Sequence, residues 1–348
     1  MHLCSPGLAT EAGSGRTLAR GKSGGGAMLR QMASLAVRQP WVKKVAVTLP
    51  GIRDVAWRFV AGEGLEDAVR AVRELESRGV HATLNYVGTH VRAEREAVAA
   101  ADAAIECLRR LSGERFVANV SVKPTHLGLD VSEELCRELL DRVVAEARRS
   151  GGFVRVDMEE SPYVERTLRI FEDVREAHGT DAVGIVLQSY LRDRGGDLDR
   201  VLAAGSRVRL VKGGYWEAAN VVYRKRADID GAFLRDIERL LVRGQKPAIA
   251  THDANAIAVA LRVAAAAKIE PGAFEFQMLY GVREDLQASL VKDGYPVRAY
   301  VPYGSRWYEY VLGCVRRLPG GALRRMAERV RVRRSIARAT SRGNVSDA

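Results

Sequence analysis

Two hydrophobic periods alternate along the chain. Short apolar runs typical of strands lie at 81–87, 116–122, 153–158, 183–190, 207–212, 248–251, 273–279 and 297–302. Between most of them, apolar residues recur every three or four positions, as in helices with one buried face, at 94–111, 133–149, 164–178 and 254–267. This alternation predicts an α/β fold with a parallel sheet covered by helices. Eight successive units favour a closed (β/α)8 TIM-type barrel.

The segments outside this repeat have a different character. Residues 1–27 are rich in Gly and Ser, lack the apolar stretch of a secretory signal, and are expected to be disordered. Residues 28–78 predict an N-terminal helical segment, since Val69, Val72 and Leu75 recur at helical spacing and Gly79 follows as a stop. We therefore assign the barrel to 79–318 and a basic helix or tail to 319–348. A doubly wound sheet is the alternative, but no G-x-G-x-x-G follows the first strand.

The composition is that of a globular protein. Hydrophobic residues make up 47% of the 348, which is enough for a large core. No apolar run approaches the roughly 18 residues of a membrane-spanning helix. The cysteines are scattered with no Cys-x-x-Cys motif, which is typical of reduced thiols in a cytosolic protein. They are Cys4, Cys107, Cys136 and Cys314.

The net charge of +12 is unevenly distributed. Residues 316–342 hold ten arginines and one acid, Glu328. A solvated helical face is the simplest interpretation, and a patch for an acidic carrier protein or an anionic membrane surface is the alternative. Nucleic acid is not expected, because no helix-turn-helix, zinc-finger or RNA-stacking motif accompanies the charge. We expect a cytoplasmic protein, with peripheral membrane binding as the alternative.

Polar side chains mark the carboxyl ends of several predicted strands, where the active sites of barrels lie. Lys123 ends the second strand, Asp157 the third and Gln188 the fourth, while Arg209 and Lys212 lie in the fifth. Taken alone, Lys123 is most simply interpreted as a surface lysine and Asp157 as a helix cap. A charged residue inside a barrel strand needs a partner or an anionic ligand, and Asp157 is the simplest partner for Arg209. No His, Cys and carboxylate set has metal-ligand spacing, so no metal is expected.

Four of these strand ends resemble one family of flavoenzymes. They read RLVKGGYWE at 209–217, ATHD at 250–253, FEFQMLYG at 274–281 and YVPYG at 300–304, and RFVAGE at 58–63 adds to them. Over 58–318 the chain resembles the monofunctional proline dehydrogenase family. The resemblance implies an FAD-dependent oxidoreductase, built on a (β/α)8 barrel, that passes hydride from a CH–NH group to flavin N5.

The resemblance also implies roles for individual residues. Those matched to the catalytic set are Lys123, Asp157, Arg209, Tyr215 and Tyr300. Those matched to FAD contacts are Gln188, Arg209, Val211, Lys212, Gly213, Trp216, Thr251, His252 and Gln277. Gly214 and Leu279 are matched to the substrate pocket, and Gly214 stands where the family usually has Ala. A cationic cluster with backbone amides is what the diphosphate of FAD requires.

The chain departs from the family at the clamp for the substrate carboxylate. The family carries Arg-Arg-x-x-Glu on the helix after the eighth strand, and counting from 300–304 places Gly313, Cys314 and Arg317 at those three positions. Arg316 and Arg317 form a pair three residues later, without a Glu behind them. Thr89 replaces the glutamate after the first strand that pairs with the clamp. Both halves of an ion pair are therefore missing.

Three hypotheses follow. Losing two charge-assisted contacts to a carboxylate costs on the order of 3 to 6 kcal/mol, so free proline is expected to bind poorly. The first hypothesis is an FAD-dependent dehydrogenase that oxidises a C–N or N–N bond of an amine, cyclic amine or hydrazine. Its carboxylate would be masked as an ester, amide or carrier-protein thioester. The second is a proline dehydrogenase that makes 1-pyrroline-5-carboxylate and uses Arg316 and Arg317, and the third is a flavin-binding protein without catalysis.

Overall fold

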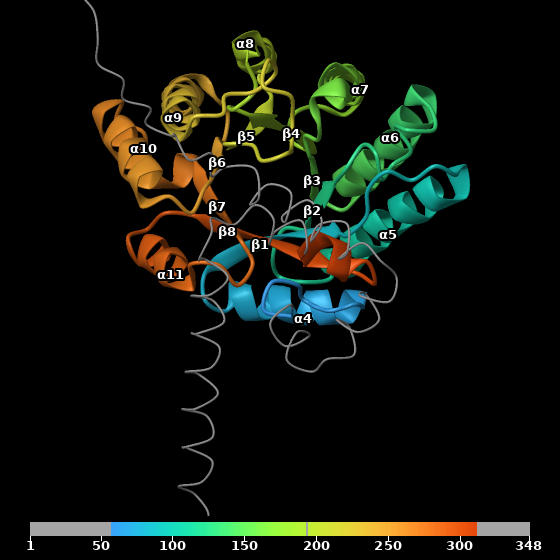
Figure 1. Cartoon of the computed structure of the whole chain (residues 1–348). Helices are drawn as coiled ribbons and strands as arrows, with labels where there is room; N and C mark the ends of the chain where they lie inside the picture. Colours follow the sequence, from blue (N-terminus) through green and yellow to red (C-terminus); the bar gives the residue numbers. More distant parts are fainter. Residues whose placement is uncertain (1–56, 193, 312–348) are drawn as a thin grey trace, which may run out of the picture. The chain divides into compact units, whose positions relative to one another are not determined.

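Eight parallel strands form a closed barrel in the computed structural model, which describes residues 57–192 and 194–311. Each strand pairs with the next, and β8 pairs with β1 to close the barrel. Figure 1 shows the strands surrounded by the helices that follow them. The strands are β1 (Val80–Tyr86), β2 (Asn119–Val122), β3 (Phe153–Val156), β4 (Val183–Gln188), β5 (Arg207–Val211), β6 (Ala248–Ala250), β7 (Glu275–Leu279) and β8 (Val297–Tyr303).

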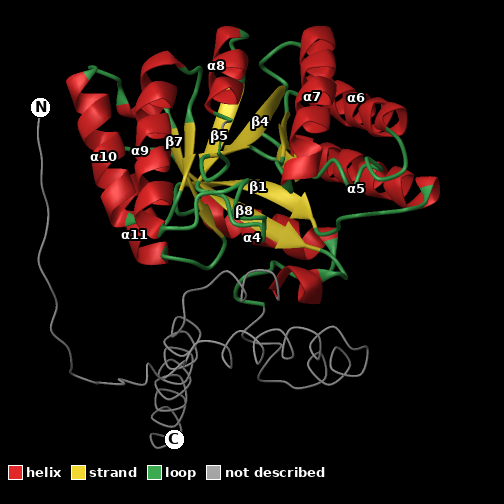
Figure 2. Cartoon of the chain, turned by 45° about the horizontal axis from the view of Figure 1, so that its top comes forward, coloured by secondary structure: helices red, strands yellow, loops and turns green. Residues whose placement is uncertain are grey.

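The helices cover the outside of this barrel (Figure 2). They are α4 (Leu65–Glu76), α5 (Glu94–Ser112), α6 (Glu133–Arg149), α7 (Val164–His178), α8 (Gly195–Ala203), α9 (Arg226–Arg243), α10 (Ala254–Ala266) and α11 (Glu284–Lys292), with 3-10 turns η1 (Ser161–Tyr163) and η2 (Pro271–Ala273). Helix α4 precedes the barrel and packs on β1 and β8. Among the described residues, no helix has both the length and the apolar character needed to cross a membrane.

The predicted barrel class is confirmed, and the strand limits shift for local reasons. The second strand begins at Asn119 and not at 116, since Val117 is 64% exposed and belongs to the preceding loop. The seventh begins at Glu275 because Ala273, predicted to start it, belongs to the 3-10 turn η2. Helices α5, α6, α7 and α10 match the predicted helical stretches. Helix α4 lies inside the predicted N-terminal helical segment, but the disordered segment 1–27 and the basic tail 319–348 lie outside the described residues.

The two faces of β7 have opposite chemistry. On β7, Phe276 and Met278 are buried in the apolar core, whereas Glu275 and Gln277 take part in polar contacts with other strands. Side chains alternate between the two faces of a strand, so the apolar positions face the helices and the polar positions face the barrel interior. Barrel interiors are more often filled by branched apolar side chains. The candidate functional site belongs to this polar interior.

The layer between strands and helices carries the main apolar core, and Phe171 on α7 is fully buried in it. We expect Phe171→Ala to lower the free energy of unfolding by about 3 to 5 kcal/mol, because it removes a large side chain and leaves a cavity. Urea unfolding followed by circular dichroism measures this loss. Val242→Ala is the control, since Val242 is 60% exposed and its loss should cost less than about 0.5 kcal/mol. Equal losses in the two variants would contradict the assignment of the core.

Candidate active site

The site is centred on Asp157, which directly follows β3 and is 5% exposed. Its Oδ2 accepts hydrogen bonds from Lys123 Nζ at 2.6 Å and from the Tyr300 hydroxyl at 2.9 Å. Its Oδ1 accepts from Arg209 Nη2. Residues that follow or belong to β2, β3, β5 and β8 thus meet on one carboxylate. The structure brings together four of the five residues matched to the catalytic set, and Asp157 is the predicted ion-pair partner of Arg209.

The charge states follow from these contacts. Burial favours a neutral Asp157, but the charges of Lys123 and Arg209 hold its pKa below the usual range. Burial also disfavours a charged Lys123, yet the charge of Asp157 keeps its pKa well above the usual value. Burial and the same carboxylate raise the pKa of Tyr300. At neutral pH the site therefore holds an aspartate, an ammonium group and a neutral phenol.

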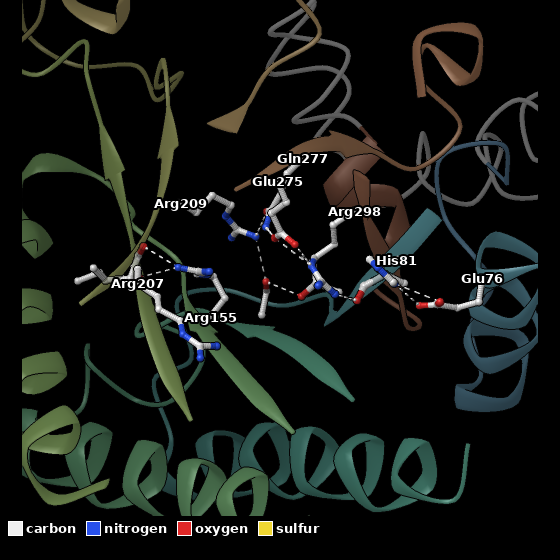
Figure 3. A network of polar contacts seen from close by, with 12 residues as sticks. Glu76, His81, Arg155, Arg207, Arg209, Glu275, Gln277 and Arg298 are labelled. Atoms are coloured by element: carbon white, nitrogen blue, oxygen red, sulfur yellow. Dashed lines mark hydrogen bonds and ion pairs between the residues drawn. The ribbon is translucent and has the colours of Figure 1, made fainter. Parts of the chain in front are cut away.

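Arg209 extends the network into the barrel interior. Its Nη1 donates to Ser121 Oγ and to Gln277 Oε1, each at 3.2 Å, and its guanidinium carbon lies 5.3 Å from the centre of the Tyr300 ring. Figure 3 shows Arg209 beside Gln277, with Glu275 and Arg298 further along the same line of contacts. Arg209 is 5% exposed. A cation this deeply buried is held by several strands and is well oriented.

A second cationic group follows the end of β5. Lys212 Nζ donates to Asp230 Oδ1 at 2.5 Å and to Asp253 Oδ2 at 2.7 Å. Burial disfavours its charge, but the two hydrogen-bonded carboxylates raise its pKa. Asp253 also caps helix α10 by accepting from the Asn255 amide, and Thr251 Oγ1 accepts from the Asp253 amide at 3.1 Å. Lys212 and Thr251 are thus tied together through Asp253.

His252, next to Thr251, is neutral at physiological pH. Burial, with a contribution from Arg283, lowers its pKa to about 4. Its Nε2 accepts from the backbone amide of Leu279 at 2.9 Å. The proton of the neutral ring is therefore on Nδ1, which can donate to a ligand oxygen. This contact also joins the ends of β6 and β7.

The loop after β5 carries the exposed part of the predicted site. Gly213 has φ +98°, and a Cβ there would lie 2.0 Å from the Tyr190 ring, so only glycine allows this close approach. The Tyr190 hydroxyl donates to the Tyr215 carbonyl oxygen at 3.4 Å. Trp216 is 94% exposed. Glu217 anchors the loop by accepting from the Ser161 amide at 2.6 Å and from its hydroxyl at 2.8 Å.

The remaining predicted residues lie around the same end of the barrel. Gln188 ends β4 and its Nε2 donates to the Glu159 carbonyl oxygen at 2.8 Å. Val211 ends β5 and pairs with Gln188 and Ala250. Leu279 ends β7, and Gly214 is exposed in the loop after β5. Gly313, Cys314, Arg316 and Arg317 lie outside the described residues, so the structure does not test the clamp.

The structure also groups three side chains that their spacing in the sequence does not connect. Ligand atoms of His90, Glu159 and Glu160 lie within 4.8 Å of one another. Glu159 already accepts from the amide and the hydroxyl of Thr125, at 2.9 and 2.7 Å, and His90 Nδ1 contacts Asp130 Oδ2 at 2.9 Å. The expectation that the protein binds no metal therefore remains a prediction.

Thr89, where the family has a glutamate, is half-buried just after β1. The neighbouring Gly88 lies against His126, and a Cβ on Gly88 would be 2.1 Å from His126 Nε2. The His126 ring stacks on Tyr86 with centroids 5.7 Å apart. Burial, followed by the charges of Arg306 and Lys123, lowers the pKa of His126 to about 4. At neutral pH, Thr89 and His126 are therefore both uncharged.

Sequence reasoning missed three interior residues of this network, Ser121, Glu275 and Arg298. Each lies two positions before a predicted site residue, namely Lys123 directly after β2, Gln277 on β7 and Tyr300 on β8. The period-2 alternation of side chains would have placed them on the interior face. Their signal was therefore present in the sequence.

The donor set at this end of the barrel fits FAD. Arg209 and Lys212 are cationic donors that are held in place by carboxylates, and the Nδ1 proton of His252 supplies a further donor. The indole of Trp216 is almost fully exposed, which is unusual for an aromatic side chain and suits stacking on a planar ring. Cations with oriented donors suit the diphosphate, and exposed aromatic surface suits the ring systems.

Comparisons with known proteins identify the family of the chain. The proline dehydrogenase family model matches residues 68–318. The chain is 35% identical over 272 residues to proline dehydrogenase 1 of Bacillus subtilis, which covers 78% of this chain and 89% of the relative. It is 37% identical over 260 residues to proline dehydrogenase of Deinococcus radiodurans, covering 74% of this chain and 84% of the relative.

A solved structure shares the fold. The crystal structure of proline utilization A (PutA) from Bdellovibrio bacteriovorus, inactivated by N-propargylglycine, aligns with a TM-score of 0.71 and 26% identity. The alignment covers 76% of this chain and 32% of the PutA chain, so this chain spans about a third of that larger protein.

The barrel and the family match together define a flavin-dependent oxidoreductase that acts on CH–NH groups and uses FAD. More specifically, the chain belongs to the proline dehydrogenase family.

The low pKa of His126 predicts a pH-dependent stability. Unfolded histidine takes up a proton near pH 6.5, whereas folded His126 does so only near pH 4. The contribution of His126 to the free energy of unfolding is therefore fully present above pH 6.5. It is lost as the pH falls from 6.5 to 4, by up to about 3 kcal/mol. We expect His126→Phe, which keeps a ring against Tyr86, to flatten the decline in unfolding free energy over this range.

Urea unfolding at a series of pH values tests this prediction. Phe171→Ala removes no titratable group and should keep the wild-type slope at a lower stability. If His126→Phe also keeps the wild-type slope, His126 is protonated in the folded protein and the neutral assignment is wrong.

Proposed function

We propose that this protein dehydrogenates a cyclic secondary amine of the proline type at the carbon next to nitrogen, and that it does not depend on an arginine clamp for the substrate carboxylate. The observation that carries the proposal is the convergence of Lys123, Arg209 and Tyr300 on Asp157 at the carboxyl-terminal face of the barrel. The relatives named proline dehydrogenase support the amine class.

The reaction converts a CH–NH unit to C=N with loss of a hydride and a proton. FAD, when bound, supplies the acceptor for the hydride and its two electrons. Gln188, Arg209, Val211, Lys212, Gly213, Trp216, Thr251, His252 and Gln277 are the residues that we propose hold it. The protein's own task is mainly to position the amine, since the hydride chemistry belongs to the cofactor.

The charge states assign the protein groups to positioning and not to proton removal. Lys123 is held protonated and Asp157 ionised, so Lys123 has no free lone pair and Asp157 is a weak base. Asp157 can accept an N–H from the substrate, and the Tyr300 hydroxyl already donates to the same carboxylate. The amine proton therefore leaves to solvent, and the substrate reacts as the neutral amine. We propose that Tyr215 and Gly214 complete this pocket.

The substrate's carboxylate is where this chain differs from the family pattern. Thr89, beside a neutral His126, replaces the glutamate of the clamp, and Gly313 and Cys314 replace its arginines by sequence count. Thr89 offers no charge to a free carboxylate, and it does not penalise an ester, an amide or a carrier thioester. The substrate class that we propose is therefore a proline-like amine with a masked carboxylate. L-Proline itself is the second candidate, favoured by the named relatives.

Anaerobic reduction of the flavin, followed by its absorbance, distinguishes the two candidates. We expect L-proline methyl ester and pyrrolidine to reduce the flavin at lower concentration than L-proline, by a factor of at least about 10 in kcat/KM. Rapid reduction at low-millimolar proline would make proline the substrate and support Arg316 and Arg317 as its clamp. Failure of all three compounds, and of a hydrazine analogue, would favour a flavin-binding protein without this activity.

A charge-restoring variant is the matched control for this experiment. The triple variant Thr89→Glu, Gly313→Arg and Cys314→Arg rebuilds both halves of the family's ion pair. It should improve kcat/KM for free proline and leave the ester unchanged or poorer. If proline turnover falls, the positions counted from 300–304 are not the clamp positions, because the variant has then added unpaired charge.

Arg209 is the cation most closely tied to the proposed site. We expect Arg209→Met to lose bound FAD, or to reduce it at least about 100-fold more slowly, because the guanidinium would stabilise negative charge on reduced flavin. Visible absorbance of the purified protein and anaerobic reduction measure both outcomes. Arg207→Met is the control on the same strand, since Arg207 pairs with the exposed Asp181. Wild-type reduction by Arg209→Met would make Arg209 a structural ion-pair partner.

The domain limits and the basic segment remain proposals. We propose that 79–318 forms the catalytic barrel, that 28–78 is a helical extension, and that the arginines of 316–342 face an acidic carrier protein or an anionic membrane surface. The charge of this segment is the support for such a partner.

A further inference from the structure

Below the proposed site, a second polar layer crosses the barrel interior from β5 to β1. Arg209 Nη1 donates to Gln277 Oε1 at 3.2 Å, and Gln277 Nε2 donates to Glu275 Oε1. Arg298 Nε donates to both oxygens of Glu275, at 3.0 and 3.1 Å, and its Nη1 donates to the Ala82 carbonyl oxygen at 2.9 Å. Figure 3 shows this line of contacts.

The chemistry of the two neighbours allows Gln277 only one orientation. An ionised carboxylate is an acceptor only, and a guanidinium is a donor only. The Gln277 amide lies between them, so its NH2 must face Glu275 and its oxygen must face Arg209. A flipped amide would set two donors against each other at Arg209 and two acceptors against each other at Glu275. Gln277 is 3% exposed, so water cannot readily relieve such a clash.

The charge of Glu275 is itself secured by its surroundings. Burial would favour the neutral acid, but Arg298 holds the pKa of Glu275 below its usual range. Arg155, 5% exposed, lies in the same interior and donates to the carbonyl oxygens of Ile185 and Arg207. Glu275 therefore supplies negative charge to this second polar layer, as Asp157 does in the proposed site.

We propose that Glu275, held by Arg298, is a positioning residue for Arg209 and acts through the Gln277 amide. Glu275 selects the amide orientation, the amide supplies an acceptor to Nη1 of Arg209, and Nη2 of Arg209 then meets Asp157. The proposal rests on the proposed function in one respect: Arg209 is taken to lie next to the flavin. The positioning itself is a property of the protein without ligand.

A double-mutant cycle in the protein freed of FAD tests the positioning directly. Glu275→Leu, Arg209→Met and their combination are compared by urea unfolding, first with Gln277 present and then in a Gln277→Leu background. We expect coupling between Glu275 and Arg209 of about 5- to 10-fold in the unfolding equilibrium constant, disappearing in the Gln277→Leu background. Coupling that survives Gln277→Leu is charge interaction through space, and additive effects with Gln277 present mean no coupling. Either result would overturn the proposal.

Flavin measurements form a second, independent arm. Glu275→Leu and Gln277→Leu should each slow flavin reduction by about 10-fold or more, and the double variant should be no slower than the slower single variant. Glu275→Gln keeps an acceptor for the Gln277 NH2 and should retain more activity than Glu275→Leu. Flavin affinity and reduction potential should also change more in Glu275→Leu than in Glu275→Gln. If Glu275→Leu lowers only the melting temperature, the positioning role is wrong.

A matched carboxylate provides the control for loss of a buried ion pair. Glu146 on α6 is 7% exposed and accepts from Arg109 and Arg149, away from the barrel interior. Glu146→Gln should lower stability without coupling to Arg209 and without changing flavin reduction. If the wild-type flavin is not reduced by any amine, the proposed function fails, while the cycle on the FAD-free protein still decides the positioning role.

Discussion

Three donors from three different parts of the barrel end on the two oxygens of Asp157, and the arrangement of the carboxyl-terminal face depends on that carboxylate. Removing one partner of a buried ion pair costs several kcal/mol, because the remaining charge has no compensation. Asp157 therefore fixes the protonated state of Lys123, the orientation of Arg209 and the donor direction of Tyr300 together. None of these side chains can rearrange alone.

The same constraint recurs one layer further inside. Glu275 balances Arg298 as Asp157 balances Lys123 and Arg209, and Gln277 joins the two layers with a neutral amide. A low-dielectric interior strengthens each satisfied contact and penalises each unsatisfied one. The position of the Arg209 guanidinium is therefore set by several strands. A site for hydride transfer requires charged groups that are fixed in this way.

Apolar and polar cores are kept apart by the strands themselves. Phe171, Phe276 and their neighbours pack between strands and helices and supply burial, while the interior face carries the polar contacts. Substitutions in the outer layer change stability, and substitutions in the inner layer change charge balance and geometry. The loop after β5, which carries Tyr215 and the exposed Trp216, is anchored by Glu217 on Ser161.

The sequence by itself determined the barrel, because the alternation of apolar strands with amphipathic helices is a local property of the chain. It also placed Lys123, Asp157 and Gln188 at strand ends, and the ends of parallel strands meet on one face of a barrel. It did not determine where β2 and β7 begin. Those starts, at Asn119 and Glu275, depend on the exposure of Val117 and on a 3-10 turn, which the strand propensities of the residues do not reveal.

The pairing of Arg209 with Asp157 was expected from the sequence, but only the tertiary structure decided the other contacts among these groups. Lys212 was matched to a cofactor contact, but its pairing with Asp230 and Asp253 joins segments far apart in the chain. The link from Glu275 through Gln277 to Arg209 likewise needs the register of neighbouring strands, together with closure of the barrel. Hydrophobic periodicity is encoded within about ten residues, whereas the partner of a buried charge is chosen by the folded chain as a whole.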